Sequence, residues 1–266
     1  MTTYWHKQTT ESPLFQDLLW SRPENKLHAG KLLVIGGNLH GFSVPAQAFN
    51  EASEAGVGTA RVVLPSSIQK TVGAFMPEAS FAPSTPSGSF AAQSLDTWLK
   101  HAAWSDATLL AGDLGRNSET AIVIESFLRK FSGKLALSKD ATDYAIHLPE
   151  ALLGRPETLL VLNFAQLQKL ASNAKVTTGL TLDMGLVRLA EALHLFTIKH
   201  PVIVLTNYLD TIVVAREGQV SSTKVQPNDT NWQTKAAVHA SVWWLQHPAQ
   251  PFQAVTASII YAQQNN

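Results

Sequence analysis

Residues 28–41 read HAGKLLVIGGNLHG, and this stretch constrains the fold more than any other part of the chain. The apolar run at residues 32–35 lacks polar alternation, as expected of a strand buried on both faces of a parallel sheet. It ends at Gly36 and Gly37, where the backbone can turn sharply and approach a ligand closely. Small residues at helical spacing follow in residues 44–56. This order predicts the start of a βαβ unit, and ligands of such sheets sit at the carboxyl ends of the strands.

Composition limits what this unit belongs to. With 266 residues and 45% hydrophobic content, the chain can bury a large core. We predict an N-terminal arm with one short helix over residues 1–27 and one domain over residues 28–266. Lys+Arg and Asp+Glu are 20 each, so no basic field is present to hold nucleic acid or a membrane surface. The chain has no cysteine, which excludes disulfides and thiolate chemistry, and a polar N-terminus favours a cytoplasmic protein.

Strand and helix signals alternate along most of the chain. Further strands are predicted at residues 59–64, 107–111, 134–137, 159–162 and 201–205, with a hairpin at 211–215 and 219–224. Helices are predicted at residues 44–56, 66–72, 91–104, 117–131, 142–146, 165–171, 181–199, 231–246 and 252–261, and a Pro- and Ser-rich loop at 76–90. The alternation predicts a three-layer α/β/α domain with a mainly parallel sheet and an edge β-hairpin.

A second glycine turn, GDLGRN at residues 112–117, follows the predicted strand 107–111, and Asn117 is placed to cap the next helix. Right-handed crossovers bring the two glycine turns to the same edge of the sheet. We therefore expect one cleft at that edge. The residues expected to line it are Gly36, Gly37, Asn38, His40, Gly112, Asp113, Gly115 and Asp140.

These segments resemble one family. The matching stretches are HAGKLLVIGGNLHG at 28–41, GVG at 56–58, AGDLGRNSET at 111–120 and the hairpin before a late helix. Together they are similar to the ATP- or ADP-dependent NAD(P)H-hydrate dehydratases, a ribokinase-like group that repairs hydrated nicotinamide cofactors. The resemblance implies a ribokinase-like fold, a small-molecule nucleotide partner (ATP or ADP, with Mg²⁺) and hydrated NAD(P)H as substrate. A homo-oligomer is expected on other grounds, because the aromatic anchors of the N-terminal arm, Trp5, Phe15 and Trp20, can pack on the domain or on a neighbouring subunit.

The second half departs from the family where chemistry is expected. The family's Asp-Ala-Asp aligns with Ser138-Lys139-Asp140, and its Thr-Pro-His-Pro-Gly-Glu aligns with the shorter Asn163-Phe164-Ala165-Gln166. The family's Lys-Gly aligns with Thr206-Asn207, and its Gly-x-Gly-Asp aligns with Asn231-Trp232-Gln233-Thr234. In ribokinase-like enzymes that last Asp is the base, and the glycines open an anion hole at the helix N-terminus. Thr234 cannot act as a base near neutral pH, and we expect Trp232 to fill the space that glycine leaves. Loss of a general base alone costs roughly a hundred- to ten-thousand-fold in rate.

Three hypotheses follow. The first is a diverged dehydratase relative that binds a nucleotide or phosphate with its catalytic motifs largely lost. The second is an active dehydratase that uses Asp140 or Asp229 in rearranged roles. The third is a structural or regulatory subunit with an empty cleft, whose aromatic arm and Trp243-Trp244 pair serve assembly.

Each site residue also has a purely structural interpretation. The glycines can form ordinary tight turns, and His40 can be a surface histidine. Asp113 can cap a helix or pair with Arg116, while Asp140 and Asp229 can cap the helices that follow them.

Overall fold

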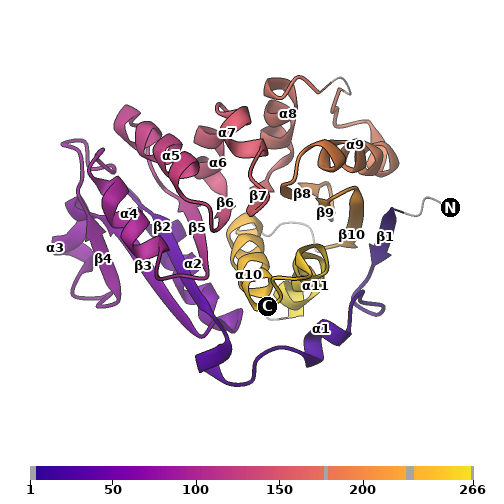
Figure 1. The fold of residues 1–266 in the computed structure, drawn as a ribbon, viewed down its shortest axis with the longest axis horizontal. Coiled ribbons are helices and arrows are strands. Elements are labelled where there is room, and N and C mark those ends of the chain that lie inside the picture. Colours follow the sequence, from indigo (N-terminus) through magenta and orange to yellow (C-terminus); the bar gives the residue numbers. More distant parts are fainter. Residues whose placement is uncertain (1–3, 177–178, 226–230, 265–266) are drawn as a thin grey trace.

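The computed structural model describes residues 4–176, 179–225 and 231–264. The described residues form one ten-stranded sheet in the order β1-β10-β9-β8-β7-β6-β5-β2-β3-β4 (Figure 1). Seven strands are mutually parallel: β2 (Lys31–Gly36), β3 (Thr59–Pro65), β4 (Ala79–Ala82), β5 (Ala107–Gly112), β6 (Lys134–Leu137), β7 (Thr158–Leu162) and β8 (Ile203–Tyr208). The mainly parallel sheet predicted from the alternation is therefore confirmed.

The predicted hairpin is present towards one edge of the sheet. Strand β9 (Thr211–Arg216) runs antiparallel to β8, and β10 (Gln219–Lys224) runs antiparallel to β9. Outside it, β1 (Trp5–Gln8) pairs in parallel with β10. The arm thus covers the outer strand of the hairpin, which would otherwise expose unpaired backbone groups.

Helices cover both faces of the sheet. One face carries α4 (Ser94–Ala102), α5 (Ser118–Lys130), α6 (Lys139–Ala145), α7 (Pro149–Leu153), α8 (Phe164–Asn173) and α9 (Gly185–Lys199). The other carries α2 (Ser43–Glu54), α3 (Gln69–Val72), α10 (Trp232–Gln246) and α11 (Pro251–Gln264). The described residues also contain two short 3-10 helices, η1 (Lys26–His28) and η2 (Ser66–Ile68). The predicted three-layer architecture is confirmed.

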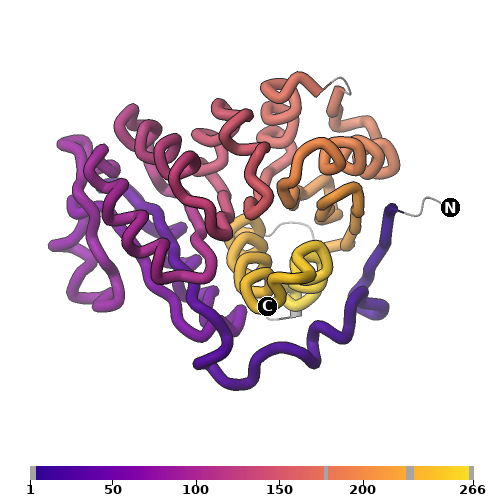
Figure 2. Tube along the Cα trace, in the orientation of Figure 1, coloured from indigo at the N-terminus to yellow at the C-terminus, as the bar shows by residue number. Residues whose placement is uncertain are grey.

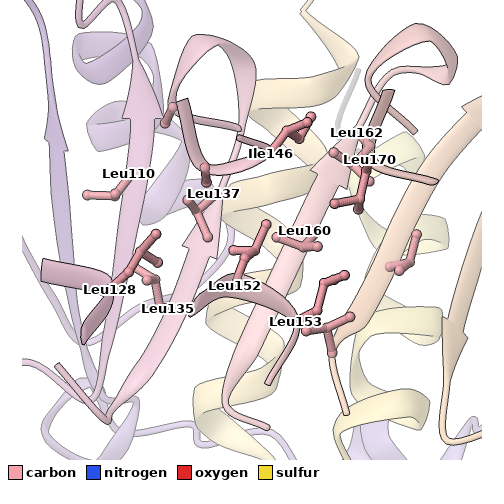
Figure 3. Packing of buried hydrophobic residues seen from close by; sticks show 14 of the residues in the cluster. Leu110, Leu128, Leu135, Leu137, Ile146, Leu152, Leu153, Leu160, Leu162 and Leu170 are labelled. Atoms are coloured by element: carbon pink, nitrogen blue, oxygen red, sulfur yellow. The ribbon is translucent and has the colours of Figure 1, made fainter. Parts of the chain in front are cut away.

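Strand side chains alternate between two hydrophobic layers. Leu33 and Leu110 face the α4–α9 side, whereas Leu32 and Leu109 face the α10 side, and all four are fully buried. Figure 3 shows part of the first layer, where Leu137 and Leu160 lie among leucines from α5, α7 and α8. Burial on both faces explains why these strands read as continuous apolar runs.

After β1, the N-terminal arm runs past the C-terminal helices before the chain re-enters the sheet at β2 (Figure 2). Its short helix α1 (Asp17–Trp20) places Leu18 against Trp243 of α10 and Ala254 of α11. Trp243 and Trp244 are 0% and 1% exposed, so the tryptophan pair is packed inside the domain. The suggestion that this pair forms a subunit contact is therefore wrong.

Two strands correct the sequence interpretation. The arm was expected to hold one short helix, yet it also supplies β1. Residues 76–90 were expected to be a loop, yet they contain β4 at the far edge of the sheet. Both strands have four residues and lie at sheet edges, where no continuous apolar run is required.

Candidate functional site at the carboxyl ends of β2, β5 and β6

The two glycine turns meet where β2 and β5 end. Gly36 and Gly112 are register partners, and Gly37 donates a backbone hydrogen bond to the Gly112 carbonyl over 3.0 Å. A Cβ at Gly36 would stand 2.4 Å from the Gly112 oxygen, so this close approach of the two strands requires glycine. Gly37, Gly112 and Gly115 all have positive φ, which glycine adopts without strain.

Asp113 links the second turn to helix α2. Its carboxylate accepts hydrogen bonds from the Val44 backbone N–H at 2.8 Å and the Ser43 hydroxyl at 3.3 Å. Helix α2 has no cap from the side chain of its own N-cap residue, Phe42. The Asp113 carboxylate thus caps this helix from another loop, where negative charge is favoured by the helix dipole.

Asn38 joins the first turn to the second. Its Nδ2 donates to the Asp113 carbonyl over 2.6 Å, and its Oδ1 accepts from the His40 backbone N–H over 2.7 Å. The His40 side chain is exposed and lies beyond this network. Asn38 therefore holds the shape of both turns, while the His40 imidazole remains at the surface.

Asp140 is the most perturbed carboxyl group of the site. Its Oδ2 accepts from the Leu114 backbone N–H at 2.9 Å, whereas its Oδ1 is buried without a hydrogen-bond partner in the described chain. Burial raises the pKa of Asp140 to about 6, a rise that the Leu114 N–H opposes and the Asp113 charge strengthens. Asp140 lies inside the first turn of α6 and binds the β5–α5 loop, so it is not a simple cap of its own helix.

A cleft of about 840 Å³ opens beside Asp140. It lies over α6, between the start of α5 and the middle of α8. Its lining residues are Gly115, Arg116, Asn117, Ser118, Ala121, Asp140, Asp143, Tyr144, His147 and Lys169. Arg116 and Lys169 are exposed at its margin together with His147 and Asp143, so two cationic side chains border a space into which the N-terminus of α5 also opens. Such a margin suits an anionic ligand.

Tyr144 fixes the loop at the edge of this cleft. Its hydroxyl donates to the Gly115 carbonyl over 2.6 Å and accepts from the Asn117 N–H over 2.9 Å. Burial raises the pKa of Tyr144, so the hydroxyl stays protonated and can donate. Asn117 caps α5 through the N–H groups of Glu119 and Thr120, as its position in the sequence predicts.

A chain of buried amides lies where the resemblance implies acid and anion-hole residues. Gln233, the second residue of α10, donates to the Val161 carbonyl over 2.7 Å and to Gln166 Oε1 over 3.0 Å. Gln166 in turn donates to the Lys139 carbonyl over 2.8 Å and forms a capping box with Asn163 in α8. Both glutamines are buried, the Nε2 of each donates within this chain and Gln166 Oε1 accepts, and an amide does not ionise, so neither side chain supplies a base.

Three polar atoms without hydrogen-bond partners belong to residues near this amide chain: Thr234 follows Gln233 in the sequence, and Thr206, which precedes Asn207, is the register partner of Leu162, the residue before Asn163. Among the described residues, Thr206 Oγ1 and Asn207 Oδ1 at the end of β8 and Thr234 Oγ1 at the start of α10 are buried and unpartnered. A buried polar group without a partner is costly, and such atoms are often satisfied by a ligand or water. Trp232 is half-buried and packs against the hydrophobic layer below α10.

The structure brings Gly36, Gly37, Asn38, Gly112, Asp113, Gly115 and Asp140 together where β2, β5 and β6 end, while the His40 side chain lies outside this group. Of the residues predicted to line one cleft, Gly115 and Asp140 line the cleft of about 840 Å³, and the others lie behind them. Asp229 lies outside the described residues. Sequence reasoning missed Tyr144, His147 and Lys169. The only signal in their spacing is that Tyr144, in the helix that follows β6, and His147, just after that helix, are three residues apart. Their roles as binding residues, like those of the predicted set, are proposals.

No protein-family model matches this chain, and no curated protein matches it in sequence. Several solved structures do match in fold. A ribokinase-like superfamily protein of Enterococcus faecalis has a TM-score of 0.75 at 13% identity, over 99% of this chain and 88% of its own. A hypothetical protein of Streptococcus mutans has a TM-score of 0.66 at 16% identity, over 93% and 88%.

The ADP/ATP-dependent NAD(P)H-hydrate dehydratase of Bacillus subtilis, co-crystallised with ATP and Mg²⁺, has a TM-score of 0.59 at 14% identity, over 94% of this chain and 86% of its own. At these identities the likeness establishes a common fold. The chain is a protein of the ribokinase-like fold, and the predicted resemblance to the dehydratases is confirmed in its architecture.

Proposed function

We propose that this chain is a diverged relative of the NAD(P)H-hydrate dehydratases that binds an adenine nucleotide or a related phosphate ligand but has lost efficient catalysis. The observation that carries the proposal is the buried Gln166–Gln233 hydrogen bond. It joins the two helix starts where the family resemblance implies a glutamate and a glycine-rich anion hole. Amides that are already hydrogen-bonded to each other and to carbonyl groups supply neither a base nor free donors for a migrating phosphate.

Binding has independent support. The glycine turns bring the carboxyl ends of β2 and β5 close together, and the adjoining cleft carries Arg116 and Lys169 at its margin. Phosphates bind well where a helix N-terminus and basic side chains converge. The unpartnered oxygens of Asn207, at the end of β8, and Thr234, in the first turn of α10, provide further polar groups.

Two carboxylates beside the cleft, those of Asp140 and Asp143, are candidate ligands for Mg²⁺. Mg²⁺ in nucleotide sites is held by one or two carboxylates together with the ligand's phosphates. Asp140 has one carboxylate oxygen without a hydrogen-bond partner, and Asp143 lines the same cleft. These are the residues that would hold the ion, whose chemistry there would be to offset phosphate charge.

Calorimetric titration of the full chain with ATP, ADP and NADPH tests the binding half of the proposal. We expect measurable affinity for at least one of them, and we expect Arg116→Glu with Lys169→Glu to weaken it by roughly a hundredfold, about tenfold for each reversed charge. Lys70→Glu, on the exposed surface of α3, is the matched control and leaves the affinity unchanged. No heat with any ligand would favour the structural subunit with an empty cleft.

One observation favours a second candidate, an active dehydratase. A carboxyl group with a pKa of about 6 beside a cleft is suited to accept and return a proton near neutral pH. This alternative requires turnover that is abolished by Asp140→Asn and that rises with pH through about 6. The first proposal requires no detectable turnover in either the wild type or the Asp140→Asn variant.

A further inference from the structure

Helix α9 is apolar on the side that faces solvent as well as on the side that faces the sheet. Leu189, Leu193 and Phe196 are buried against the sheet. On the outer side, Val187 is 64%, Leu195 50% and Ile198 60% exposed. Single exposed aliphatic residues are ordinary, but several on one helix face point to a contact surface.

A hollow lies beside Leu195. It has a volume of about 160 Å³ and is lined by Ala192, Leu195, Phe196 and Lys199 of α9 and by residues 174–176 and His200. Its walls are largely aliphatic and aromatic, and it is large enough to accept one aliphatic side chain. When two identical faces meet, the exposed leucine of each copy can enter the hollow of the other copy.

The charges on this face are arranged for contact with an identical face. Glu191 lies one helical turn before Leu195, and Lys199 lies one turn after it. When two α9 helices pack antiparallel about a twofold axis at Leu195, each Glu191 comes level with the Lys199 of the other copy. The arrangement therefore brings opposite charges together twice around one apolar centre.

We infer that the outer face of α9, formed by Val187, Glu191, Leu195, Ile198 and Lys199, is a contact between two copies of this chain. The axis passes close to Leu195, and each Leu195 enters the hollow of the opposite copy. One helix pair buries a small interface, below about 1,200 Å², so the association is weak and reversible. This inference is independent of the proposed function, because α9 contributes no residue to the cleft described above.

Sedimentation equilibrium of the full chain, from low micromolar to near-millimolar concentration, tests this contact. We expect a monomer–dimer equilibrium, and we expect Leu195→Glu to weaken dimerisation at least tenfold. Ile122→Glu is the matched control, because Ile122 is also an aliphatic residue on a helix surface, 56% exposed on α5. It should dimerise as the wild type does, and circular dichroism establishes that both variants are folded.

Charge reversal tests the geometry. Glu191→Lys places two lysines at each contact and should weaken the dimer several-fold, whereas the double variant Glu191→Lys with Lys199→Glu restores opposite charges and should recover wild-type affinity. A monomer at every concentration would overturn the inference. So would a dimer that Leu195→Glu leaves intact, or a double variant that is weaker than Glu191→Lys alone.

Discussion

Gln233 donates a hydrogen bond to Gln166 over 3.0 Å, although the two residues are 67 positions apart and begin different helices. The pair ties the N-terminus of α10 to that of α8, and Gln166 continues the connection to the Lys139 carbonyl at the start of α6. Three helix starts at the carboxyl edge of the sheet are thus held by amide groups.

Restoring the family's acid at this position should destabilise the protein. In Gln166→Glu, a carboxylate oxygen replaces the amide that donates to the Lys139 carbonyl, so a buried charge faces a carbonyl oxygen. We expect the free energy of unfolding at pH 7 to fall by about 2 to 4 kcal/mol in urea denaturation. Gln69→Glu, at an exposed position, should change it by less than about 0.5 kcal/mol. Equal stability of Gln166→Glu and the wild type would show that the amide chain does not form.

Asp140 is expected to lower the stability of the fold at neutral pH. Its pKa is about 6 in the folded protein and close to the ordinary value of 3.8 in the unfolded chain, so the folded state holds its proton more tightly. Stability therefore falls as pH rises from about 4 to 6. The stabilising effect of Asp140→Asn should be about 2 kcal/mol larger at pH 8 than at pH 4.5, as measured by urea unfolding of both proteins. An effect that is the same at both pH values would contradict the raised pKa.

The sequence predicts the buried framework well because local patterns specify it. Residues 32–35 must form a strand covered on both faces, and the glycines after it must turn; the position of Gly36 beside Gly112 then follows from crossover handedness. Prediction fails where the partner is distant. Trp5 pairs with Val220, and the polar segment that contains it has no pattern of its own to indicate a strand.

The same limit applies to the site. Asp113 was weighed as a cap or an ion-pair partner, but the helix that it caps, α2, lies some 70 residues earlier in the chain. Asn163 and Gln166 could be placed by alignment with a family motif, whereas their connection to Gln233 depends on how the N-termini of α8 and α10, which cover opposite faces, meet at the carboxyl edge of the sheet. Such contacts come from tertiary packing, which local propensity does not encode.

A buried histidine links α2 to α10. His239, whose side chain is 0% exposed, donates from Nε2 to the Glu51 carboxylate over 2.7 Å. Burial lowers the pKa of His239 although Glu51 opposes this, and the hydrogen bond lowers the pKa of Glu51. Lys235 and Arg22 also disfavour the protonated imidazole.

Because the unfolded histidine takes up a proton more readily than the folded one, stability should fall as pH drops below about 6.5. His239→Leu should lose part of this dependence. Chemical denaturation at pH 7.5 and pH 5.5 measures it, and a wild-type stability that rises on acidification over this interval relative to the variant would contradict the assignment.

Arg22 fastens the arm to the C-terminal helices. Its guanidinium lies 4.6 Å from the Trp243 ring centroid and 4.8 Å from that of Tyr261, and its Nε donates to Gln246 over 3.2 Å. A further hydrogen bond reaches the Ala55 carbonyl at the end of α2. We expect Arg22→Ala to lower the free energy of unfolding by about 2 kcal/mol, and Arg22→Lys to recover part of it, because lysine keeps the charge but not the planar fork. A neutral effect of Arg22→Ala in thermal and urea unfolding would show that the arm is not held here.

An aspartate at position 234, where the related family has its base, should not by itself restore catalysis. Thr234→Asp adds a carboxylate at the start of α10, where Thr234 is 1% exposed, while Trp232 and the Gln166–Gln233 pair stay in place. We expect no ATP- or ADP-dependent loss of hydrated NADH or NADPH above background. Turnover recovered by this single substitution would show that the anion hole is intact.

The most direct test of binding without turnover uses one sample of the wild-type chain for two measurements. The affinity for ATP and ADP is determined by titration, and the ATP- or ADP-dependent consumption of hydrated NADPH is followed at saturating nucleotide. We predict saturable nucleotide binding with no detectable dehydration. Turnover within tenfold of roughly ten per second, a typical enzyme median, would contradict the account and show that another residue serves as the base.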